Sequence, residues 1–132
     1  MRLYPPIWTV TRRAHQDYKI GDYVVPSGAS VRVSQFVMHR DARFFPEPET
    51  FEPQRWTAEA RATRPRFAYF PFGAGPRQCI GEAFAWLQGI LLLATLASRW
   101  RLRLAPGHQV RMRPHVTLRP KYGMRMLLSR RR

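Results

Sequence analysis

The chain has 132 residues, of which 45% are hydrophobic and 13% aromatic, with one cysteine and a formal net charge of +15 at pH 7. This length excludes more than one ordinary domain, although the apolar content suffices for a core. A single cysteine excludes an internal disulfide framework, which indicates a reducing compartment, and we predict a soluble, cytoplasmic protein. The most apolar stretch, residues 83–97, contains Gln88 and is shorter than a membrane span, so we expect no membrane segment.

The positive charge is uneven along the chain. All eight acidic residues lie at or before Glu82, whereas 11 of the 23 basic residues follow it. Such an asymmetry can mark a surface for nucleic acid or for an acidic protein. No nucleic-acid-binding motif accompanies the charge, so we expect no nucleic-acid partner. A non-catalytic basic binding module stands as an alternative function.

The first third of the chain predicts short antiparallel strands. Residues 1–6 end in two prolines and are typical of the last turn of a helix that proline stops. Glycine and proline at residues 21–22 and 26–28 interrupt apolar runs and predict turns. These turns would join the strands into an antiparallel meander. We place the strands at residues 7–13, 18–20, 23–25 and 29–34.

A proline-rich coil follows a short helix predicted at residues 35–39. Five prolines between residues 41 and 71 leave little room for regular structure, and residues 39–71 are assigned to this coil. An irregular segment of this length is rare in a compact domain and usually wraps something or carries function. Its aromatic residues are expected to be buried anchors: Phe44, Phe45, Phe51, Trp56, Phe67, Tyr69 and Phe70.

A long helix and a set of strands complete the chain. Residues 82–98 are almost uninterruptedly apolar, which predicts a buried helix. Strands are expected at residues 102–104, 110–112, 116–119 and 124–128, with a turn at residues 120–123. The fold class predicted is mainly α with small β-sheets (α+β).

The cysteine loop, residues 72–81, directly precedes the long helix and contains Cys79. A thiolate at a helix N-terminus is stabilised by the partial positive charge and the free N–H groups there. One thiolate presented in this way can form a single bond to an open-sided metal centre. The loop therefore points to a haem iron with an axial cysteine ligand.

Four motifs, in the right order, resemble the C-terminal part of a cytochrome P450, a haem-thiolate monooxygenase. Residues 51–56 resemble the family's Pro-x-Arg-aromatic motif, and residues 2–6 the end of its Glu-x-x-Arg helix. Residues 39–41 match a further common pattern. The cysteine loop matches every fixed position of the haem-binding signature: Phe72, Gly75, Arg77, Cys79 and Gly81.

The resemblance implies a role for each residue of the signature. Cys79 would be the axial ligand of the iron of haem b (iron protoporphyrin IX). Gly75 would supply a turn conformation closed to other residues, and Gly81 would let the backbone lie close to the porphyrin. Phe72 would shield the sulfur from water, and Arg77 would pair with a haem propionate.

Further roles follow from the same resemblance. Arg12 is expected to be the second propionate arginine, with Arg13 as the other choice. Arg2 and Arg55 would share an ion-pair cluster that locks the coil over the cysteine loop. The partner glutamate of Arg2 would lie three residues before it, ahead of Met1. Substrate-pocket positions fall at Ile7, Trp8, Thr9 and Val116, where core packing is an equal explanation.

The function implied is a haem-dependent monooxygenase that hydroxylates a small apolar organic substrate. Its electrons would come from a ferredoxin or from a flavodoxin or reductase type of donor. A haem-thiolate peroxygenase or isomerase-type relative is the alternative within the resemblance. A complete family member is much longer, so we expect residues 1–132 to be a truncated C-terminal haem-binding part of one domain that is inactive alone. The long distal helix with its oxygen-activating residues is absent, and no catalytic residue is assigned.

Overall fold

The structure is a computed structural model, and it describes residues 1–131. The chain forms two compact units, Met1–Gly73 and Ala74–Arg132. The strands of both units pair in antiparallel two-stranded sheets, and a few helices accompany them. This content confirms the predicted class of small antiparallel sheets combined with helices.

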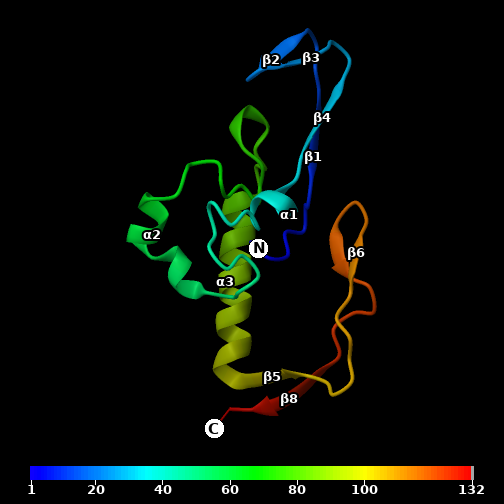
Figure 1. The fold of residues 1–132 in the computed structure, drawn as a ribbon. Coiled ribbons are helices and arrows are strands. Elements are labelled where there is room, and N and C mark those ends of the chain that lie inside the picture. The colour runs from blue at the N-terminus through cyan, green and yellow to red at the C-terminus, as the bar shows by residue number, and fades with distance from the viewer. Residues whose placement is uncertain (132) are drawn as a thin grey trace. The chain divides into compact units, whose positions relative to one another are not determined.

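Two short ribbons make up the start of the first unit. Strand β1 (Val10–Arg13) pairs with β4 (Ser30–Val33), and β2 (Tyr18–Ile20) pairs with β3 (Tyr23–Val25). Figure 1 shows the β2–β3 hairpin beyond the end of the β1–β4 ribbon. The predicted meander is wrong, because the hairpin is nested inside the β1–β4 pair. The predicted strand positions are confirmed, although β1 begins three residues later than expected.

The segment that joins this ribbon to the coil folds as expected. Helix α1 (Gln35–Met38) is capped by the Ser34 hydroxyl, which accepts a hydrogen bond from the Val37 N–H. The Ser34 hydroxyl also donates to the carbonyl of Trp8. The helical turn predicted at residues 1–6 is absent, because this part of the described chain is irregular.

The proline-rich segment contains more regular structure than predicted. A 3-10 helix, η1 (Pro53–Trp56), and a short α-helix, α2 (Ala58–Ala62), lie within it. Pro53 stands in the first turn of η1, where its missing N–H leaves no bond unmade. The side chains of Glu52 and Thr57 cap the two helices. Proline therefore starts a helical turn here instead of preventing one.

The interior of the first unit is small and unusually polar. Phe45 is 0% exposed and is its one large apolar side chain among the buried residues. The prediction of buried anchors is correct for Phe45 but wrong for Phe51, which is 82% exposed. Trp56 and Phe67 are exposed as well. The buried residues of the unit are Arg2, Pro5, Gln35, His39, Phe45, Ala68 and Pro71.

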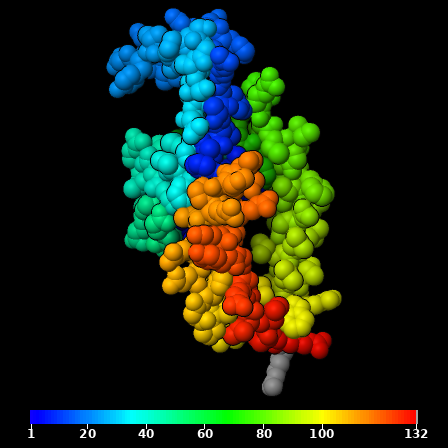
Figure 2. Space-filling view, turned by 90° about the vertical axis from the view of Figure 1, so that its right-hand side faces the viewer, coloured from blue at the N-terminus to red at the C-terminus, as the bar shows by residue number. Residues whose placement is uncertain are grey.

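The second unit is one long helix followed by two ribbons. The 3-10 turn η2 (Gly75–Arg77) precedes helix α3 (Glu82–Arg99), which ends one residue later than predicted. Strand β5 (Trp100–Leu104) pairs with β8 (Met126–Arg130), and β6 (Met112–Pro114) pairs with β7 (Leu118–Pro120). Figure 2 shows the surface of these ribbons in yellow to red. The strands thus lie close to their predicted positions, with shifts of about two residues.

Helix α3 has no buried side chain in the described part of the chain, and the burial expected for residues 82–98 stays a prediction. None of its residues is buried, and its leucines and isoleucine are more than 40% exposed. Strand β5 contacts the end of α3, which it follows directly in the chain. A helix that is apolar all round needs partner surfaces on several sides. No helix in the described part of the chain is long and apolar enough to cross a membrane.

Candidate functional site

The cysteine loop is a series of tight turns. Gly73 has φ of +78° and Gly75 of +71°, both in the left-handed region that favours glycine. The N–H of Gln78 donates to the carbonyl of Gly75 at 3.0 Å and closes the η2 turn. A Cβ at Gly75 would meet no atom within 4 Å, so the backbone conformation is what favours glycine there. This agrees with the reason given for Gly75 from the sequence.

Cys79 lies exposed at the entrance of α3. It stands two residues before Gly81, the N-cap of the helix, which offers no side-chain cap. The first-turn N–H groups are therefore not bound by a capping side chain, and they carry the partial positive charge of a helix start. A Cβ at Gly81 would lie 3.8 Å from the Cys79 Sγ, an ordinary contact. The sulfur by itself thus leaves room for a small side chain at Gly81.

The donor set at Cys79 suits a metal that already has other ligands. Within residues 1–131 no group of three or more His, Cys, Asp or Glu side chains could hold a metal ion. A bare ion would find one protein ligand at Cys79, too few for a stable site. An iron held by a porphyrin needs one axial thiolate on an open side, and the exposed Cys79 provides it. The residues therefore fit a haem.

Glu82 ties the loop to the helix, a contact that sequence reasoning missed. Its carboxylate accepts hydrogen bonds from the Gln78 side-chain amide and from the Trp86 Nε1, the latter at 3.1 Å. Gln78 immediately precedes Cys79, so Glu82 links the loop at that point to the second turn of α3. The carboxylate also lies in the first turn, where it complements the helix dipole. The spacing of four residues between these side chains was the available signal.

The candidate propionate arginines fall in different units. Arg77, the last residue of η2, is exposed and has no side-chain partner among residues 1–131. Arg12 and Arg13 are consecutive residues of β1 and so point to opposite faces of the strand. The Arg13 Nε donates to the carbonyl of Gly28 at 3.1 Å, whereas Arg12 contacts only the carbonyl of its neighbour Thr11. Arg12 is therefore the freer of the two, and its role at a propionate stays a prediction.

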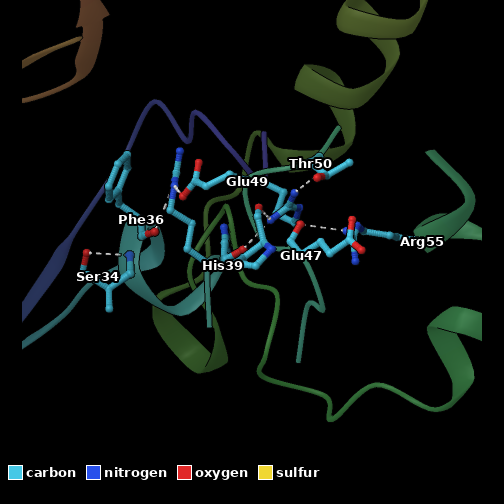
Figure 3. A network of polar contacts seen from close by, with 11 residues as sticks. Ser34, Phe36, His39, Glu47, Glu49, Thr50 and Arg55 are labelled. Atoms are coloured by element: carbon cyan, nitrogen blue, oxygen red, sulfur yellow. Dashed lines mark hydrogen bonds and ion pairs between the residues drawn. The ribbon is translucent and has the colours of Figure 1, made fainter. Parts of the chain in front are cut away.

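Arg2 is the centre of a buried polar network in the first unit. Its guanidinium donates to the carbonyls of His39 and Thr50, each at 2.9 Å, and to that of Pro48. Figure 3 shows this network with His39 near its centre and Arg55 at its edge. Arg55 donates to the carbonyl of Glu47 at 3.0 Å. The two arginines thus hold the irregular backbone by charge-assisted hydrogen bonds.

Of the expected ion-pair cluster, the described residues contain the two arginines, Arg2 and Arg55, and neither forms an ion pair. Burial, and next to it the charge of Arg55, lower the pKa of Arg2 from its ordinary value. The Nε of Arg55 is buried and has no hydrogen-bond partner among the described residues. The ion pairs of this unit are Arg40 with Glu49 and Arg43 with Asp41 instead.

The remaining predicted positions are spread over both units. Phe72 is half-buried in the first unit, and Gly81 belongs to the second. Ile7 and Val116 are exposed, at 39% and 81%, whereas Trp8 and Thr9 are half-buried. Their place in a substrate pocket stays a prediction.

The chain resembles known proteins over nearly its whole length. The family profile "Cytochrome P450" matches residues 1–127. Cyclooctatin synthase of Streptomyces melanosporofaciens is 41% identical over 118 residues, which cover 89% of this chain and 26% of that protein. Cyclooctat-9-en-7-ol 5-monooxygenase of the same organism is 41% identical over 107 residues, which cover 81% and 23%.

Solved structures agree with the sequence match. Retinoic acid bound cyanobacterial CYP120A1 has a TM-score of 0.92 to this chain at 34% identity, with 98% of this chain and 30% of that chain covered. The chain spans about a quarter of the length of the curated relatives it matches and corresponds to their C-terminal part.

Proposed function

The chain belongs to the cytochrome P450 family, and from this premise we propose that it is the proximal haem-binding part of a haem-thiolate monooxygenase. The observation that carries the proposal is the exposed Cys79 thiol at the start of α3, inside a loop whose turns follow the haem-binding signature. When bound, the haem supplies the chemistry of oxygen activation. The residues of this chain hold and orient it.

Each residue of the loop then has a physical task. Cys79 would bind the haem iron through its sulfur, next to the N-terminus of α3. Arg77 and Arg12 are placed on exposed backbone and would bind the propionate groups through their guanidinium forks. Phe72 would exclude water from the sulfur, which keeps the local dielectric low. Gly75 maintains the turn that directs the loop into η2.

The reaction class rests on the relatives. One relative is named a monooxygenase and another a synthase, so the family resemblance supports a haem cofactor more strongly than a particular reaction. We propose hydroxylation of a small apolar organic substrate, with electrons from a ferredoxin or a flavodoxin or reductase type of donor, in a cytoplasmic setting. The peroxygenase or isomerase-type alternative differs in whether dioxygen and donor electrons are consumed.

Residues 1–132 alone are expected to be inactive. They correspond to about a quarter of each relative, and haem needs protein on both faces to exclude water. Product formed by the 132-residue chain with haem and donor would contradict this expectation. Catalytic tests therefore use a complete family domain that carries this chain.

The monooxygenase reaction is tested by isotope labelling. The haem-loaded domain is supplied with a reduced donor, an apolar substrate and isotopically labelled dioxygen, and the product is analysed by mass spectrometry. We expect one labelled oxygen atom in the product and dependence on the donor. Product formed from hydrogen peroxide alone, with no label from dioxygen, would instead establish the peroxygenase alternative. A basic binding module predicts no product and salt-dependent binding that survives Cys79→Ala.

A further inference from the structure

His39 is a buried histidine that the proposed haem site does not use. It is the C-cap of α1 and is 0% exposed. Its Nε2 accepts a hydrogen bond from the backbone N–H of Phe70 at 3.0 Å, although the two residues are 31 positions apart. An Nε2 that accepts carries no proton, so the ring is neutral with its proton on Nδ1.

The ring of His39 is also held by its neighbours. Its centroid lies 4.8 Å from that of Tyr69 and 5.3 Å from that of Phe70, the second in an edge-on arrangement. Its backbone carbonyl accepts from the Arg2 guanidinium at 2.9 Å. Both its backbone and its side chain are therefore fixed. A rigid acceptor of this kind can define the position of the N–H that it binds.

The N–H bound by His39 belongs to the residue from which the cysteine loop departs. The carbonyl of Phe70 accepts from the N–H of Gly73 at 3.0 Å, across a turn that contains the buried Pro71. Phe72 lies within this turn, and Gly73 follows it in the left-handed conformation. The N–H of Phe70 is thus held by His39, and the carbonyl of the same residue closes the turn with which the cysteine loop begins.

We propose that neutral His39 is a positioning residue that fixes the first turn of the cysteine loop through its Nε2 acceptor. The functional meaning of this inference rests on the proposed function, because an ordered start of the loop matters only if the loop holds haem. The hydrogen bond itself exists in the chain without haem, and it is tested there. Failure of the test would thus leave the haem proposal standing.

The surroundings of the ring keep it neutral over a wide pH range. Burial, then the N-terminal ammonium, Arg2 and Arg40, lower the pKa of His39 to about 4 from an ordinary value of 6.5. These cations and the Tyr69 phenol are the titratable groups that face the ring. Its buried Nδ1 has no partner within residues 1–131, and neither has the amide of Gln35, one turn earlier on α1. The Arg2 backbone favours the charged ring, but the effects that lower the pKa outweigh it, so the acceptor persists down to a pH near 4.

The test compares two substitutions in the ¹⁵N-labelled 132-residue chain by NMR. His39→Phe keeps the ring and removes the acceptor, whereas His39→Gln offers a carbonyl oxygen at a similar reach. We expect the amide exchange of Phe70 to accelerate by about tenfold or more in His39→Phe, the loss expected for one hydrogen bond, and to recover in His39→Gln. His15→Phe, at an exposed histidine of the same unit, is the matched control and should change nothing.

Two spectral signatures separate positioning from general packing. The ring nitrogens of the unchanged chain should show the tautomer protonated at Nδ1. The Phe70 amide shift should follow pH with a midpoint near 4, and this step should vanish in His39→Gln. A proton on Nε2 at neutral pH, or equal exchange of the Phe70 amide in all variants, would overturn the proposal. Amide exchange of Phe70 that is as fast in a folded His39→Gln chain as in a folded His39→Phe chain would overturn it as well.

Discussion

Replacing Phe45 by alanine is expected to lower the free energy of unfolding of the first unit by about 3–5 kcal/mol. Phe45 is 0% exposed and is the one large apolar side chain buried in this unit, so its removal leaves a cavity that few neighbours can fill. The guanidinium carbons of Arg2 and Arg64 lie 5.2 and 4.7 Å from its ring centroid, and both cation–π contacts would be lost. The ring therefore supports the buried arginine network as well as the core.

A urea titration followed by tryptophan fluorescence measures this effect. The matched control is Phe51→Ala, the same change at a side chain that is 82% exposed, where a shift within about 0.5 kcal/mol is expected. Equal shifts for the two variants would show that Phe45 is not the centre of this unit's packing.

Replacing Arg2 by methionine is expected to destabilise the same unit by about 2–3 kcal/mol. The substitution keeps most of the apolar stem but leaves the carbonyls of His39, Pro48 and Thr50 without their donor. These carbonyls belong to irregular backbone, which has no ladder or helix to pair with them. Removal of a positive charge beside Arg55 relieves some repulsion and keeps the expected loss moderate.

Thermal unfolding of Arg2→Met, Arg2→Lys and the unchanged chain tests this. Lysine retains the charge but lacks the planar fork that serves several carbonyls, so an intermediate stability is expected. Arg43→Met is the control, because Arg43 pairs on the surface with Asp41 and its loss should be undetectable. A loss for Arg43→Met as large as that for Arg2→Met would contradict the role of the buried network.

The sequence predicted local elements better than their pairing and burial. The bounds of α3 were correct within one residue, because its apolar run starts directly after a glycine turn. The β1–β4 pair was missed because alternation marks strands but carries no information on which distant strand pairs with which. Burial of α3 stays a prediction, because apolar character shows only that a helix needs a partner. Whether one packs on it depends on surfaces far away in the chain.

In the candidate site, too, local features could be predicted from the sequence, whereas contacts between distant residues could not. The turn glycines and the exposed cysteine at a helix start followed from composition and order within ten residues. The bond of His39 to Phe70 could not be predicted, because it joins residues 31 positions apart through a backbone N–H, which has no sequence signature. The hydrogen bonds of Glu82 with Gln78 and Trp86 could in principle have been predicted from the spacing of four residues between these side chains.

The most direct test of the account is the carbon monoxide spectrum of the reduced, haem-loaded domain, recorded with Cys79 and with Cys79→Ala. Ser98→Ala, an exposed position near the end of α3, serves as the control. Because a thiolate donates electron density to the iron, we predict a long-wavelength Soret band for the unchanged protein and the control, and its complete loss in Cys79→Ala. A band that persists in Cys79→Ala, or that never appears although haem is bound, would contradict the assignment of Cys79 as the iron ligand.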